Sequence, residues 1–122
     1  MFDILHDNGW YDGRKIDFKS LQEFKNKTLI NGYISHNYAV NFFEEFGNLE
    51  IALIHNKKFS TKFPSQNPLI GFYNNIGNNN KNNVPIGLLD GFPIFISEDG
   101  KFYYEGKFLG NTTFQMFQSI FI

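Results

Sequence analysis

The chain has 122 residues, a formal net charge of -1 and no cysteine. This length suits one domain, and we expect residues 1–122 to form a single one. The near-neutral charge argues against a direct nucleic-acid surface, and the lack of cysteine excludes disulfides, thiolate metal sites and a thiol nucleophile.

The N-terminal residues predict a short helix. Residues 2–8 bring three apolar side chains close together, and Gly9 suits the left-handed conformation that ends a helix. The segment has neither the basic nor the apolar region of a signal peptide, and no apolar run in the chain approaches the roughly 20 residues that span a bilayer. We therefore expect a soluble, cytoplasmic protein that has no membrane contact.

The next segment, "NGWYDGRKID", contains the only tryptophan and the only arginine of the chain. We expect Trp10 to pack against the core, because a tryptophan beside a helix-ending glycine is usually highly buried. Gly13 would let the chain turn, and Arg14 would bind a carboxylate or the carbonyl groups at a helix end. The alternative is a direct binding role, in which Trp10, Arg14 and a histidine line a ligand pocket.

Two longer helices are expected next. Ser20 and Glu23 form a capping-box pattern, which predicts that the first helix begins at Ser20 and extends to Gly32. The predicted apolar face of this helix consists of Leu21, Phe24, Thr28 and Leu29.

The second of these helices is the clearest in the chain. Ser35 suits its N-cap position and Gly47 its end. Its apolar stripe follows the i, i+3, i+4, i+7 spacing and consists of Ala39, Phe42, Phe43 and Phe46. Glu44 and Glu45 point away from that stripe.

From residue 49 the apolar pattern changes to period two, which predicts strands. Residues 49–54 form one strand, and residues 57–63 are its hairpin partner. The run of asparagine, glycine and lysine over residues 74–83 predicts an exposed loop. Beyond it, residues 84–110 read as a meander of short strands with hairpin turns at Asp90-Gly91 and Asp99-Gly100.

The last residues predict a helix. Thr112 and Gln115 form a second capping box. The apolar face of this helix would consist of Phe114, Phe117, Ile120 and Phe121. Helices, then strands, then one helix indicate an α+β protein with an antiparallel sheet of short strands.

No pattern indicates an enzyme, a metal site or a cofactor site. The three histidines, at positions 6, 36 and 55, lack metal-ligand spacing, and no nucleophile elbow is present. We expect them to be surface histidines. The chain also lacks a phosphate-binding glycine loop between a strand and a helix. These negatives favour a binding protein.

Four blocks, in order along most of the chain, resemble the third group of the SUKH superfamily. "LHDNGWYDGRKID" has the Gly-Trp, Gly-Arg and aliphatic-Asp pairs of that group, and "FFEEFGNLEI" is similar to its helix ending in aromatic-Gly-Gly-Leu. Asn48 stands in place of the usual second glycine. "VPIGLLDGFPIFISEDGKFYY" has Pro-Ile-Gly before a strand and an acidic-Asp-Gly turn, and "FLGNTTFQMFQSIFI" has Leu-Gly before a terminal helix.

This resemblance implies an α+β SUKH fold and an immunity protein of a bacterial polymorphic or contact-dependent toxin system. Such a protein binds a cognate toxin, frequently a nuclease or deaminase domain, and blocks it without turnover. We expect a monomer or weak homodimer without a cofactor. The motif residues that we expect to act structurally are Gly9, Trp10, Gly13, Arg14, Gly47, Gly87 and Gly110.

A toxin that acts on nucleic acid tends to be basic, so acidic patches on an inhibitor would steer association. Tyrosines are frequent anchors of interfaces. The candidate partner-binding residues are Glu44, Glu45, Glu50, Asp90, Glu98, Asp99, Tyr103, Tyr104 and Glu105. A regulatory or scaffold module of the same fold is the alternative, and a small enzyme or ligand binder is a third.

Overall fold

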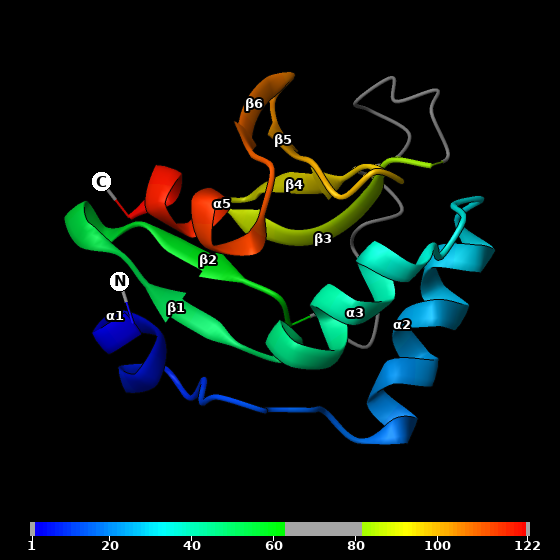
Figure 1. Cartoon of the computed structure of the whole chain (residues 1–122), viewed down its shortest axis with the longest axis horizontal. Coiled ribbons are helices and arrows are strands. Elements are labelled where there is room, and N and C mark those ends of the chain that lie inside the picture. The colour runs from blue at the N-terminus through cyan, green and yellow to red at the C-terminus, as the bar shows by residue number, and fades with distance from the viewer. Residues whose placement is uncertain (1, 63–81, 122) are drawn as a thin grey trace.

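A computed structural model of the chain describes residues 2–62 and 82–121. It contains one six-stranded antiparallel sheet in which each strand pairs with the next along the chain (Figure 1). The strands are β1 (Glu50–Ala52), β2 (Lys58–Ser60), β3 (Val84–Leu89), β4 (Phe92–Ile96), β5 (Phe102–Tyr104) and β6 (Lys107–Gly110).

Four helices lie within the described residues, and they confirm the α+β class. They are α1 (Phe2–Asp7), α2 (Phe18–Ile30), α3 (Asn37–Phe46) and α5 (Thr113–Ile120). Figure 1 shows α5 in front of the middle of the sheet and α3 beside the sheet, between it and α2. A short 3-10 turn, η1 (Ile54–Asn56), joins β1 and β2.

The core is a chain of aromatic rings that links these layers. Trp10 stacks on Phe46 with 6.0 Å between ring centroids. Phe46 contacts Phe117 of α5 at 5.1 Å, and Phe117 contacts Phe59 of β2 at 5.9 Å. Because aromatic pairs add to the energy of area burial, this chain of contacts ties the N-terminal segment to both α3 and the sheet. Of the 16 phenylalanines in the chain, eight are buried in the described residues, and several others are exposed at the surface.

Period-two patterning predicts the first two strands correctly, but β1 covers only Glu50–Ala52 of the predicted 49–54, and β2 is Lys58–Ser60. Residue 54 belongs instead to the turn η1. Ile51 and Phe59 face each other across β1 and β2, and both are fully buried. The turn between β3 and β4 has positive φ at Asp90 (53°) and Gly91 (87°), the combination that a two-residue hairpin requires. A bulge between Pro85 and Gly87 inserts one extra residue into β3.

The caps of α2 and α3 differ from the sequence prediction by one to three residues. The N-cap of α2 is Asp17, whose side chain accepts a 2.7 Å hydrogen bond from the backbone N–H of Ser20. The N-cap of α3 is His36 rather than Ser35: its Nδ1 accepts from the N–H of Ala39 at 3.2 Å. Several polar residues before each helix could accept from the unpaired backbone N–H groups of its first turn. Residue type alone therefore does not select the cap.

Two apolar faces also need correction. Leu29 was expected on the buried face of α2, but its side chain is 72% exposed. In α5 the fully buried side chains are Met116 and Phe117, while Phe114 lies at the surface. The buried face of α5 is therefore rotated by part of a helical turn from the predicted face.

Both edge strands have backbone groups bound by side chains. The Asn8 side chain accepts from the N–H of Ala52 in β1 at 3.3 Å, and Ser119 of α5 donates to the carbonyl of Leu109 in β6 at 2.7 Å. Such contacts reduce the tendency of an edge to pair with another chain.

Phe63 and almost all of the loop predicted over residues 74–83 lie outside the described residues. Within the described part of the chain, none of the helices is both long and apolar enough to cross a bilayer.

Candidate functional site

The Gly-Trp and Gly-Arg motif fastens the N-terminal segment to the end of α3. Trp10 is 3% exposed, and its Nε1–H donates to a carboxylate oxygen of Glu45 at 2.9 Å. The Arg14 guanidinium donates to the carbonyls of Glu45 at 2.6 Å and Gly47 at 2.7 Å. Of the two partners expected for Arg14, it binds the carbonyls at a helix end, where a cation is favoured by the helix dipole.

Burial lowers the pKa of Arg14, and the nearby Tyr11 and Glu45 oppose that shift. A guanidinium remains charged at any ordinary pH. Arg14 therefore acts as a permanent cationic cap of α3, and its two Nη atoms donate to backbone carbonyls there.

Three positions in the first two motif blocks have a positive φ angle, which explains the residue types found there. Gly9 has φ of +104° and Gly13 has φ of +78°, conformations that side chains with a Cβ rarely adopt. Asn48, which replaces the usual second glycine, has φ of 59°. Asparagine is among the few residues that tolerate this conformation, so the replacement preserves the backbone.

The other motif glycines are required by close packing. A Cβ at Gly47 would lie 2.7 Å from a ring carbon of Phe43, and one at Gly87 would lie 2.6 Å from the ring of Phe59. A Cβ at Gly110 would lie 2.7 Å from the Cβ of Gln115, in the first turn of α5. Gly87 and Gly110 therefore set how closely β3 approaches β2 and β6 approaches α5, whereas Gly47 leaves room for the Phe43 ring at the end of α3.

The first acidic group, Glu44, Glu45 and Glu50, does not form one patch. Glu45 accepts from Trp10, while Glu50 lies on the outer face of the sheet. Lys58 lies 2.8 Å from Glu50 and Lys62 lies 3.9 Å from it. The hydrogen bond and charge of Lys58 lower the pKa of Glu50. Its negative charge is thus largely neutralised.

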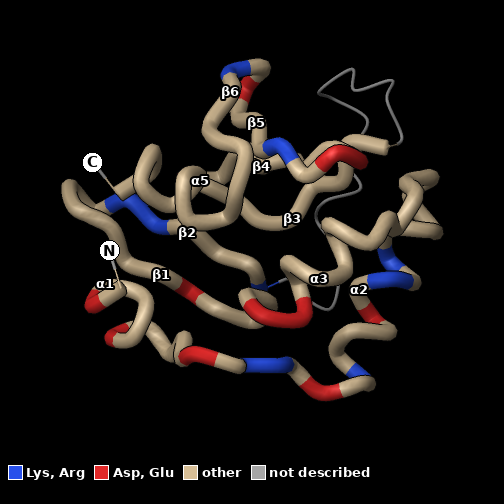
Figure 2. The backbone as a smooth tube through the Cα atoms, viewed as in Figure 1, with Lys and Arg blue, Asp and Glu red and all other residues tan. Residues whose placement is uncertain are grey.

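The second acidic group is divided between opposite ends of the meander. Asp90 follows β3 and Glu105 follows β5, so both lie at one end, near Tyr104. Glu98 and Asp99 lie in the loop between β4 and β5, at the other end. Figure 2 shows this acidic loop separated from the β5–β6 turn.

The two candidate tyrosines lie on opposite faces of β5. Tyr104 packs against the core and donates its hydroxyl hydrogen to the carbonyl of Leu89 at 3.0 Å. Burial raises its pKa, and Glu105 and Asp90 add to the effect. Tyr103 is half-buried on the outer face, where its ring contacts Phe108. Of the two tyrosines, Tyr103 is therefore the better candidate for contact with a partner, because the Tyr104 hydroxyl is hydrogen-bonded to Leu89.

A groove of about 280 Å³ lies between α3, the β4–β5 loop and the N-terminal end of α5. Its floor is made of Phe42 and Phe46 from α3 and Phe102 from β5. The Phe42 and Phe102 rings meet edge to face at 5.7 Å, and all three are nearly fully buried. The floor is thus rigid and apolar.

Polar side chains form the walls of this groove. Tyr38, Asn41 and Glu45 come from one stripe of α3, and Thr112 and Thr113 face them from α5. Tyr38 is 53% exposed. A built Cβ on Gly100 would lie 2.8 Å from the Tyr38 ring, so the β4–β5 loop supports that ring from behind.

Sequence reasoning identified only Glu45 among these wall residues. Tyr38, Asn41, Phe42 and Glu45 follow the i, i+3, i+4, i+7 spacing, which places them on one helix face. The sequence alone could therefore have predicted that these four residues share one helix face. The walls contributed by α5 and the β4–β5 loop depend on tertiary packing and have no local signal.

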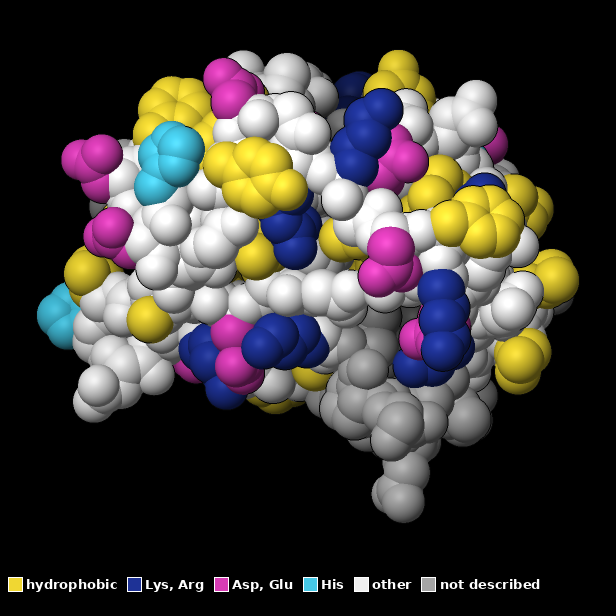
Figure 3. Space-filling view, turned by 90° about the horizontal axis from the view of Figure 1, so that it is seen from below, with side chains coloured by type: hydrophobic (Ala, Val, Ile, Leu, Met, Phe, Trp, Pro, Cys, Tyr) yellow, Lys and Arg dark blue, Asp and Glu magenta, His cyan; other side chains and the backbone are white. Residues whose placement is uncertain are grey.

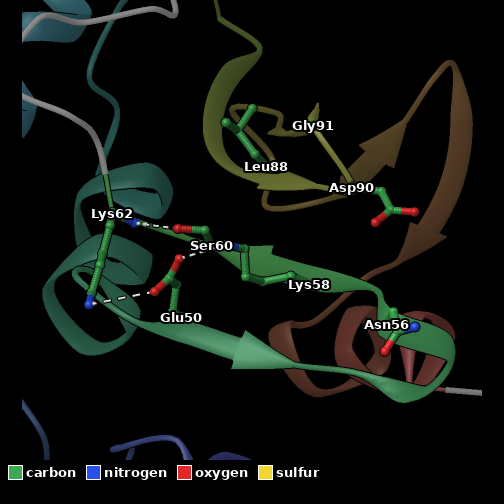
Figure 4. A pocket seen from close by; sticks show the side chains of 8 residues that line it. All are labelled: Glu50, Asn56, Lys58, Ser60, Lys62, Leu88, Asp90 and Gly91. Carbon is green, nitrogen blue, oxygen red and sulfur yellow. Dashed lines mark hydrogen bonds and ion pairs between the residues drawn. The ribbon is translucent and has the colours of Figure 1, made fainter.

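A second hollow of about 600 Å³ lies on the outer face of β1–β3 (Figure 4). Most of its lining residues have polar side chains, and Lys58 and Lys62 lie on either side of Glu50 within it. Asp90 lies across the hollow from them (Figure 4). Charges of both signs alternate there, so the hollow has no net preference for an anion or a cation.

The face seen from below carries α1 and the segment after it. Figure 3 shows hydrophobic, acidic and basic side chains interspersed on this face, without a block of one charge. The exposed aromatic rings of Phe2, Tyr11 and Phe18 belong to these N-terminal elements.

The histidines serve local structure or lie at the surface. His6 and His55 are exposed, as expected. His36 is half-buried instead: it caps α3, and its Nε2 lies 3.2 Å from the carbonyl of Ile96. Within residues 2–62 and 82–121, no group of three or more His, Asp or Glu side chains is arranged to hold a metal ion.

The helices and the antiparallel meander define a small α+β protein whose Gly-Trp and Gly-Arg motif is built into the end of α3. The family model described as SUKH-3 immunity protein matches residues 2–121. The chain therefore belongs to the SUKH-3 immunity protein family, and the resemblance drawn from the four sequence blocks is confirmed. No curated protein and no solved structure matches the chain significantly.

Proposed function

We propose that this protein binds one cognate bacterial toxin in the cytoplasm and blocks it by covering its active surface. The toxin would be a nuclease or deaminase domain. The observation that carries this proposal is the SUKH-3 immunity protein match, which extends over residues 2–121. The acidic and aromatic candidates from the sequence supply the contact chemistry.

The exposed aromatic side chains support a protein partner in particular. Tyr38 stands on the rim of the groove, and Phe2 and Phe114 contact each other near the start of α5 with 5.1 Å between centroids. Aromatic side chains bury a large area at low entropic cost, and tyrosine is a frequent hot spot of interfaces.

Inhibition by occlusion has a stoichiometric signature. We expect toxin activity in vitro to fall linearly with added protein and to reach zero at about one immunity protein per toxin, because each toxin must stay covered. Loss of toxin activity at a small fraction of that ratio, continuing with time, would instead reveal turnover and contradict the proposal.

The decisive experiment is co-expression with the toxin domain encoded by the neighbouring gene. We expect growth to be rescued and a complex to be recovered by size-exclusion chromatography. Failure of both rescue and complex formation would refute the proposal. A stable complex with a non-toxic protein in place of the toxin would support the regulatory or scaffold alternative.

We also propose that the free protein is a monomer or a weak homodimer. Light scattering coupled to chromatography at two concentrations tests this. A concentration-independent dimer mass would contradict it.

A further inference from the structure

The groove between α3, the β4–β5 loop and α5 is small, with room for a long side chain. Pockets that hold small molecules or cofactors usually measure about 300–1000 Å³, and this one measures about 280 Å³. Its floor of Phe42, Phe46 and Phe102 presents aromatic carbon, and its walls are polar. An occupant should therefore combine an apolar stem with a polar head.

The charges around the groove favour a cation. Among the described residues, Glu45 is the only charged one that lines the groove. Glu98 and Asp99 lie in the loop that supplies Gly100 to the wall, where Lys101 lies 3.6 Å from Asp99. In Figure 2 the acidic end of α3 and this acidic loop lie on two sides of the region between α3 and α5.

Three positive features oppose this preference: Lys101, Arg14 and the N-terminal end of α5. Lys101 is paired with Asp99 at 3.6 Å and does not line the groove. Arg14 lies close enough to influence Glu45, but its guanidinium is bound to backbone carbonyls and does not line the groove. The N-terminal end of α5 carries about half a unit charge, and the Thr112 side chain already caps it. The carboxylates therefore make the electrostatic potential in the groove negative.

We infer that the groove receives an arginine side chain of the protein partner, a conclusion that rests on the proposed function for the identity of that partner. The arginine stem lies over the Phe42 and Phe46 rings, and its guanidinium meets the Tyr38 ring and the Glu45 carboxylate. Arginine fits better than lysine because its planar head stacks on aromatic faces, is weakly hydrated and binds a carboxylate through two donors.

A peptide titration tests the chemistry of the groove without the toxin. The uniformly ¹⁵N-labelled full chain is titrated with acetyl-Gly-Arg-Gly-amide and, separately, with acetyl-Gly-citrulline-Gly-amide. Citrulline has nearly the same shape as arginine but no charge. We expect saturable shifts of the Asn41, Gly100 and Thr113 amides with arginine, and about five- to tenfold weaker binding of citrulline. Equal binding of the two peptides, or no saturable shift with arginine, would overturn the inference.

Two variants and one control connect the groove to the toxin. Glu45→Gln removes the charge but keeps an oxygen acceptor for Trp10, and Asn41→Lys places a competing cation on the exposed rim. Glu23→Gln is the matched control, because Glu23 is exposed on α2 and does not line the groove. We expect each groove variant to weaken toxin binding at least about tenfold and the control to change it by less than about twofold.

The outcomes separate the two proposals. If the wild-type protein neutralises the toxin and both groove variants do so equally well, the arginine site is wrong and the proposed function stands. If the wild-type protein does not bind the toxin, the proposed function fails, and the peptide titration still decides the chemistry of the groove. Circular dichroism and thermal unfolding of each variant establish that it is folded.

Discussion

At the level of single residues, the Trp10 and Arg14 contacts show what a local motif can reveal. The sequence indicated that Trp10 would be buried and that Arg14 would bind a carboxylate or a helix end, and the structure places both at the end of α3. The partner of the indole N–H was not foreseen. Glu45 lies 35 positions away from Trp10, and no local pattern links them.

Replacing Trp10 with alanine should lower the free energy of unfolding by about 3–5 kcal/mol, the usual cost of removing a large buried aromatic. Trp10→Phe keeps most of the apolar contact but loses the bond to Glu45, so its cost should be smaller. Urea unfolding at constant m-value measures both. A Trp10→Ala protein of unchanged stability that no longer binds its partner would instead assign Trp10 to the interface.

The backbone at Asn48 allows a second test. Asn48→Ala should cost about 1–2 kcal/mol, because alanine has a steric penalty at positive φ. Asn48→Gly should restore the usual family residue at little or no cost. The same urea experiment distinguishes them, and equal effects of the two substitutions would show that the side chain of Asn48, rather than its φ, matters.

At the level of helices and strands, periodicity predicted the segments well and their ends less well. The stripe on α3, the alternation in β1 and the hairpin at Asp90 all follow from burial and turn geometry that neighbouring residues share. The N-caps at Asp17 and His36 were missed. A cap depends on the direction from which the preceding chain arrives. For α2 the chain is held just before the cap by Ile16, whose N–H donates to the carbonyl of Glu44.

The cap of α2 gives a pH-dependent prediction. The hydrogen bond from the Ser20 N–H lowers the pKa of Asp17 in the folded protein. A carboxyl with a lower pKa when folded stabilises the protein fully above its unfolded pKa of about 4, and that stabilisation is lost as the pH falls through the folded value. Asp17→Ala should therefore destabilise the protein at pH 7 and have little effect at pH 2–3.

Asp17→Asn is the matched control, because asparagine keeps the acceptor and removes the titration. Thermal unfolding of the three proteins between pH 2 and pH 7 measures the difference. An alanine variant that is destabilised equally across this range would contradict the assignment of the cap to an ionised Asp17.

At the level of the whole molecule, the α+β class and the antiparallel sheet were predictable, and the groove was not. Element order and hairpin signals define the meander because each strand pairs with its sequence neighbour. The groove joins residues from α3, the β4–β5 loop and α5, whose proximity results from packing across the core. The acidic candidate residues are near one another in sequence, but the sheet topology places them at different ends and faces of the sheet.

The continuous core predicts a single cooperative unfolding transition, as expected if residues 1–122 form one domain. Side chains from all four described helices and from β1 to β5 belong to one buried cluster. Calorimetry should give equal calorimetric and van't Hoff enthalpies. Two resolved transitions, or a calorimetric enthalpy well above the van't Hoff value, would show independent units and contradict the one-domain proposal.

Helix α3 has two sides on which folding places different demands. Ala39 and Phe43 are held by the interior, whereas Tyr38 and Asn41 project outward from the same ten residues. Mutations on the outward side can accumulate without cost to folding. A few substitutions on the exposed side of α3 could therefore change which binding partner is recognised, while the rest of the fold stays the same.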